Sequence, residues 1–129
     1  MLAAAAVAIL LAATVAGCSS KPAYCTDRTN LENSVKGLTS LNFSGGVTSA
    51  IQSQVSKIQT NATALVNSAK SDFPSQTSAI TSSVDALKSS VTALASDRSA
   101  ANVATATKDA SNVVNSVNSF NDATSSQCG

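Results

Sequence analysis

The strongest constraint on the fold is a repeated spacing of apolar side chains at intervals of three and four residues. This spacing places apolar residues on one face of an α-helix, whereas strands alternate with a period of two. Four stretches show it: Leu31, Val35 and Leu38; Ile51, Val55, Ile58, Ala62, Leu65 and Ala69; Ile80, Val84, Leu87, Val91 and Leu94; and Val103, Ala106, Ala110, Val113, Val117 and Phe120. The sequence therefore predicts amphipathic helices that each bury one face.

Helix-breaking residues separate the four stretches. Ser44-Gly45-Gly46 precedes the second stretch, and Phe73-Pro74 precedes the third, where proline suits the first turn of a new helix. The third break falls around Asp97 and Ser99, either of which would cap the last helix. These boundaries predict helices at about 27–41, 46–71, 75–96 and 99–125.

The first predicted helix is the shortest. Thr29 and Glu32 have the spacing of a capping box, so we expect this helix to begin close to them. Glu32 and Lys36 also form an i,i+4 pair in the favourable order.

Consecutive antiparallel packing of these helices predicts an all-α, up-down-up-down four-helix bundle. That topology places the start of the first helix and the end of the fourth at the same end. Ser, Thr, Asn and Val are mediocre helix formers, so a β-solenoid or a disordered chain is the alternative. The strict three-four spacing favours the bundle.

An apolar run from Leu2 to Val15 precedes the helical region. It is shorter than the roughly 20 residues that span a bilayer, and it is typical of a signal-peptide core. The run leads into Val15-Ala16-Gly17-Cys18, followed by Ser19-Ser20. This motif resembles the lipobox of bacterial lipoproteins, which has a branched apolar residue, two small residues and a cysteine.

The resemblance implies that residues 1–17 are a lipoprotein signal peptide and that the thiol of Cys18 takes a diacylglycerol thioether. Residues 18–25 would then form a lipidated tether, and residues 26–128 the helical bundle domain, on the extracytoplasmic face of the cell membrane. Only Met1 precedes the apolar run, without the usual Lys or Arg, so we interpret the start as assigned too far downstream or trimmed. The alternative is a buried apolar helix with an incidental cysteine.

With Cys18 assigned to the lipid, Cys25 and Cys128 remain. An even number of cysteines in an exported protein indicates a disulfide. A bridge between these two would close a loop of about 100 residues and stabilise the fold by roughly 4.7 kcal/mol in the chain-entropy model. The bridge agrees with an even helix count, because an odd number of long helices would separate the thiols by on the order of 30 Å. The alternative is two free thiols at frayed ends. A zinc site is disfavoured, because the chain has no His and two thiols do not complete a tetrahedral site.

Composition argues against most other site chemistry. The 8 Lys and Arg residues nearly balance the 7 Asp and Glu residues, and no basic stripe exists, so we expect no nucleic-acid binding. The absence of His removes the usual general base, and the carboxylates are scattered along the chain. We therefore predict that the protein is not an enzyme and has no cofactor or metal site.

These features favour a membrane-anchored lipoprotein with a non-catalytic structural or interaction role at the cell envelope, where its polar faces would contact a protein or a glycan. The layout is similar to that of small Ala/Ser/Thr-rich lipoproteins of high-GC Gram-positive bacteria. The alternative is a carrier that holds an apolar ligand between its helices, where Ala62, Ala69, Ala106 and Ala110 leave room. Tyr24 would pack over the bridge or lie near the lipid surface.

Overall fold

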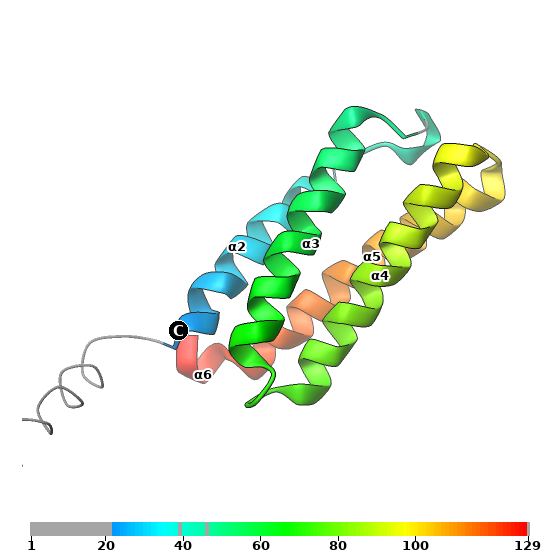
Figure 1. Cartoon of the computed structure of the whole chain (residues 1–129). Coiled ribbons are helices and arrows are strands. Elements are labelled where there is room, and N and C mark those ends of the chain that lie inside the picture. Colours follow the sequence, from blue (N-terminus) through cyan, green and yellow to red (C-terminus); the bar gives the residue numbers. More distant parts are fainter. Residues whose placement is uncertain (1–21, 39, 46, 129) are drawn as a thin grey trace, which may run out of the picture.

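The computed structural model describes residues 22–38, 40–45 and 47–128; the lipobox-like motif and Cys18 lie outside these residues. The described elements are α2 (Ala23–Leu38), the 3-10 turn η2 (Phe43–Gly45), α3 (Ser49–Ala69), α4 (Pro74–Ser96), α5 (Ala100–Ala123) and α6 (Ser125–Cys128). Four long helices form an antiparallel up-down-up-down bundle, in which α2 also contacts α5 and closes the ring (Figure 1). The predicted all-α bundle is confirmed.

The predicted apolar stripes form the core of the bundle. Every stripe residue of α2, α3 and α4 is buried, and Leu65 and Leu87 are completely inaccessible. On α5, four of the six are buried, whereas Val103 and Ala110 are only partly covered. Burial of one apolar stripe per helix is the main source of stability here, because the helices are rich in Ser, Thr, Asn and Val, which are mediocre helix formers.

Side-chain caps and a proline set the starts of the three longer helices. The hydroxyl of Thr48 accepts a hydrogen bond from the backbone N–H of Ile51 at the start of α3, at 3.3 Å. Pro74 is the first residue of α4. Ser99 caps α5 by accepting from the backbone N–H of Asn102 at 3.3 Å, so of the two candidate caps the structure selects Ser99.

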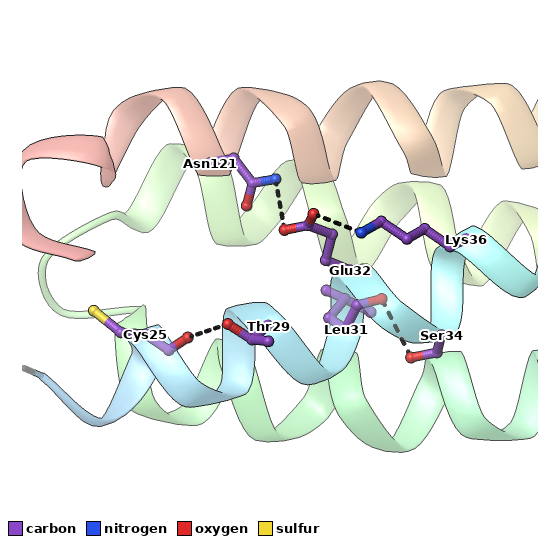
Figure 2. Close-up of polar contacts among 7 residues, drawn as sticks. All are labelled: Cys25, Thr29, Leu31, Glu32, Ser34, Lys36 and Asn121. Carbon is purple, nitrogen blue, oxygen red and sulfur yellow. Dashed lines mark hydrogen bonds and ion pairs between the residues drawn. The ribbon is translucent and has the colours of Figure 1, made fainter. Parts of the chain in front are cut away.

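The start of α2 differs from the prediction. The helix begins at Ala23, directly after Pro22, whose carbonyl accepts from the N–H of Cys25 at 3.0 Å. Thr29 therefore lies inside the helix, and its hydroxyl donates to the carbonyl of Cys25 at 3.1 Å (Figure 2). The expected capping box is wrong, because the helix starts at Ala23, about 1.7 turns before Thr29. The i,i+4 pair is confirmed: Lys36 Nζ lies 3.3 Å from Glu32 Oε1.

The start of α2 and the C-terminal α6 lie at the same end of the bundle, as Figure 1 shows. The predicted fourth helix, 99–125, divides at Thr124 into α5 and the four-residue α6. The opposite end, hereafter the distal end, carries the α2–α3 and α4–α5 connections (Figure 1). Arg98 joins these two connections by donating from Nη1 to the carbonyl of Gly45 at 3.2 Å.

Candidate functional site

A disulfide joins Cys25 in the first turn of α2 to Cys128 in α6. The S–S distance is 2.04 Å, the Cα atoms are 5.4 Å apart, and 103 residues separate the two cysteines in sequence. Both are buried, at 7% and 4% exposure. The predicted pairing is confirmed, and its burial fits a structural bond rather than a reactive thiol pair.

Three aromatic rings pack at the disulfide end. Tyr24 meets Phe73 edge to face with ring centroids 5.4 Å apart, and it meets Phe120 at 6.1 Å. Phe73 and Phe120 are 5.5 Å apart. Such edge-to-face pairs are favourable beyond the apolar area they bury. Tyr24 is only 4% exposed, so its ring belongs to the bundle core beside the bridge.

A polar network ties α2 to α5 next to these rings. Arg28 Nη1 donates to Thr124 Oγ1 at 3.1 Å and to the carbonyl of Asn121 at 3.5 Å. The amide of Asn121 donates to Glu32 Oε2 at 3.3 Å, and Glu32 also pairs with Lys36 (Figure 2). Arg28 and Glu32 therefore connect α2 to the end of α5, whereas Lys36 pairs with Glu32 within α2.

A second polar seam ties α3 to α2, and it was not predicted from the sequence. Gln54, Asn61 and Ser68 repeat at intervals of seven residues along α3. Gln54 Nε2 donates to the carbonyl of Ser34, Asn61 Nδ2 to the hydroxyl of Ser34 at 2.7 Å, and the Ser68 hydroxyl to Asp27 Oδ2 at 2.7 Å. The signal in the sequence that could have indicated this seam is the seven-residue spacing of these polar side chains beside the apolar stripe of the same helix.

A surface groove, the α2–α5 groove, forms where α2 ends. Because α2 stops at Leu38, it does not reach along the distal half of α5, where η2 contacts α5 instead. The hollow has a volume of about 320 Å³, and its lining is Leu38, Leu41, Asn42, Phe43, Ser44, Val103, Thr107, Ala110, Ser111 and Val114. None of these side chains is charged.

A second groove, the α3–α4 groove, consists of two adjoining hollows that share Gln59. Their volumes are about 220 Å³ and 320 Å³. The lining toward the disulfide end is Gln59, Ala62, Thr63, Val66, Asn67, Thr81, Val84 and Asp85. The lining toward the distal end is Val47, Gln52, Val55, Ser56, Gln59, Lys88, Val91, Thr92 and Ala95. This groove has an apolar floor and polar walls.

The small residues expected to leave room for a ligand divide between the core and these grooves. Ala69 and Ala106 are completely buried, whereas Ala62 lines the α3–α4 groove and Ala110 the α2–α5 groove. Within residues 22–38, 40–45 and 47–128, no group of three or more His, Cys, Asp or Glu side chains is arranged to hold a metal ion. Among the helices described, none has the length and apolar character that crossing a bilayer requires.

Comparison of the chain with protein-family models, with curated proteins and with solved structures gives no match.

Proposed function

We propose that the protein is a lipid-anchored lipoprotein on the extracytoplasmic face of the cell membrane, with a non-catalytic structural or protein-interaction role at the cell envelope. The Val15-Ala16-Gly17-Cys18 motif carries this proposal, since it follows an apolar run of signal-peptide length. The Cys25–Cys128 disulfide supports it independently. Such bonds persist in oxidising compartments outside the cytoplasm and are rare within it.

The position of the disulfide also fits an anchor at Cys18. Five residue steps separate Cys18 from Ala23, where α2 begins, and they span at most roughly 18 Å when extended. The anchor would therefore hold the disulfide end near the membrane and leave the distal end facing away from it. A diacylglycerol supplies two acyl chains, which are enough for stable attachment.

The test is the intact mass of the protein purified from the native membrane in detergent. The expected species begins at Cys18, carries a diacylglyceryl group and weighs two hydrogens less than the reduced chain because of the bridge. A Cys18→Ser variant is the matched control: it should keep the bridge and lose the lipid and the membrane fraction. A water-soluble, unacylated wild-type protein would overturn the proposal.

A second candidate function is the carriage of an apolar ligand, and the α2–α5 groove favours it. Its volume of about 320 Å³ is at the lower limit of ligand pockets, and six of its lining residues are apolar. Its polar rim is partly engaged, because the hydroxyl of Thr107 donates to the carbonyl of Val103 and that of Ser44 to Oδ1 of Asn42 at 2.5 Å. The groove therefore suits a hydrocarbon chain better than a hydrogen-bonding ligand.

Native mass spectrometry with a saturated fatty acid tests this second candidate. An Ala110→Leu variant should fill the groove and abolish binding while leaving the fold intact, because Ala110 is only partly covered. Ala79→Leu, at an exposed position on α4, is the control. Equal binding by both variants would exclude the groove as the site.

A further inference from the structure

Helix α3 has two polar flanks that differ in how their side chains are used. The flank toward α2 carries Gln54 and Asn61, whose amides both donate to Ser34. The flank toward α4 carries Gln52, Gln59 and Asn67. Within the part of the chain that the structure describes, the side-chain amides of these three residues have no hydrogen-bond partner. The α3–α4 groove therefore presents amides that are not needed to hold the bundle together.

These amides lie along two adjoining hollows that meet at Gln59. Gln59 lines both hollows, so the groove runs from the level of Gln52 to that of Asn67, which is roughly 22 Å along a helix. Its floor is aliphatic and buried: Val55 and Val91 toward the distal end, Ala62 and Val84 toward the disulfide end. The accessible C–H surface comes mainly from Val47 and Val66, which are only partly buried, and the walls offer hydrogen bonds.

The charge of the groove is balanced. Its charged lining residues are Asp85 and Lys88, three residues apart on α4 and both exposed. Neither makes an ion pair within the described residues. A strongly charged polymer would gain attraction from one of them and repulsion from the other, so the groove is complementary to an extended and nearly neutral partner.

We infer that the α3–α4 groove binds a neutral polysaccharide strand that carries acetamido groups. A side-chain amide offers both donors and an acceptor, and an acetamido group offers the complementary pair. Sugar rings also present C–H faces to an aliphatic floor and hydroxyls to polar walls. A peptide strand fits less well, because two helices provide no unpaired backbone edge for strand addition. The inference rests on the proposed function in one respect: an envelope location would bring the groove to such polymers.

The test is titration of the oxidised full-length chain, in detergent, with soluble oligomers of β-1,4-linked N-acetylglucosamine, followed by NMR or calorimetry. The groove contains no aromatic platform, so we expect weak binding, with the largest spectral changes at Gln52, Gln59 and Asn67. The fully deacetylated oligomer and dextran should each bind at least about tenfold more weakly, because they lack the acetamido group.

A double variant, Gln59→Ala with Asn67→Ala, should weaken binding by about tenfold or more, since each lost hydrogen bond costs severalfold in affinity. Asn112→Ala with Asn118→Ala removes two exposed amides from α5 and is the matched control. It should bind as the wild type does. Thermal unfolding of both double variants checks that the bundle is intact.

Equal binding of the acetylated oligomer and dextran would overturn the inference, as would changes that map outside the groove or preferential binding of an unstructured peptide. Its failure is distinct from failure of the lipid anchor. The Cys18→Ser variant should bind the oligomer as the wild type does, whereas acylation is measured by mass alone.

Discussion

Arg28 and Thr124 are 96 residues apart in sequence, and Arg28 Nη1 donates a hydrogen bond to Thr124 Oγ1 at 3.1 Å. Thr124 is fully buried at the junction of α5 and α6, and Arg28 lies one turn after Cys25 on α2. The contact therefore holds together the same two chain ends that the disulfide joins. The ends of this bundle are fixed twice, once covalently and once by a charge-assisted hydrogen bond.

Removal of the disulfide should cost much of the stability of the domain. We expect Cys25→Ser with Cys128→Ser to lower the free energy of unfolding by about 4–5 kcal/mol, because the bridge closes a loop of 103 residues. Urea unfolding monitored by circular dichroism measures the change. Reduction of the wild type should give a similar loss, and Cys18→Ser should give none. A loss below about 1 kcal/mol would show that the bridge does not constrain the unfolded chain as the entropy model requires.

Thr124→Val keeps the shape of the side chain and removes the hydroxyl that Arg28 contacts. We expect a loss of about 1–3 kcal/mol, because Arg28 Nη1 loses its shorter hydrogen bond and keeps only the 3.5 Å contact to the carbonyl of Asn121. Thr105→Val, at an exposed position on α5, is the control and should change stability by less than about 0.5 kcal/mol. Equal effects of the two substitutions in chemical denaturation would contradict the role given to this contact.

Phe120→Ala should be among the most damaging single substitutions. The ring is completely buried and contacts both Tyr24 and Phe73, so its removal leaves a cavity at the disulfide end. A loss of about 3–5 kcal/mol is expected. Differential scanning calorimetry gives the value, and the neighbouring exposed substitution Ser119→Ala serves as the reference. A small effect would mean that the end of the bundle collapses to fill the space.

Because Ser99 caps a helix and Thr29 lies inside one, we expect opposite effects on stability when each is replaced by alanine. Ser99→Ala removes the cap of α5 and should cost about 1 kcal/mol. Thr29→Ala should be neutral or slightly stabilising, since Thr29 lies inside α2, where alanine is the better helix former. Thermal midpoints of the two variants decide between this arrangement and a helix that begins near Thr29, for which Thr29→Ala would be the costlier change.

The sequence predicted the core better than it predicted the surfaces. The stripe from Ile51 to Ala69 is buried residue for residue, because apolar periodicity is imposed by the bundle core itself. The start of α2 was missed, because the capping-box spacing of Thr29 and Glu32 indicated a later start, whereas Pro22 before Ala23 has no capping side chain. The Arg28–Thr124 contact was missed for another reason, since it depends on the relative height of two helices that are far apart in sequence.

The grooves illustrate the same limit. The α2–α5 groove exists because α2 ends at Leu38 and not at residue 41, a difference that is usual for a helix boundary predicted from sequence. The amides of Gln59 and Asn61 are two residues apart, yet one lines a groove and the other is bonded to α2. Which of these two amides is bonded to α2 and which lines a groove depends on where the neighbouring helices lie, and the sequence does not give that.

The Cys25–Cys128 bond turns the bundle into a covalent ring, since peptide bonds connect the two cysteines along one path and sulfur connects them along the other. A single cut by a protease in the exposed link around Arg98, between α4 and α5, would open that ring without releasing a fragment. The two halves would stay attached through the bridge for as long as the surroundings remain oxidising. Reduction of the bridge would then separate the two halves, so the bridge decides whether a cleaved chain remains one molecule.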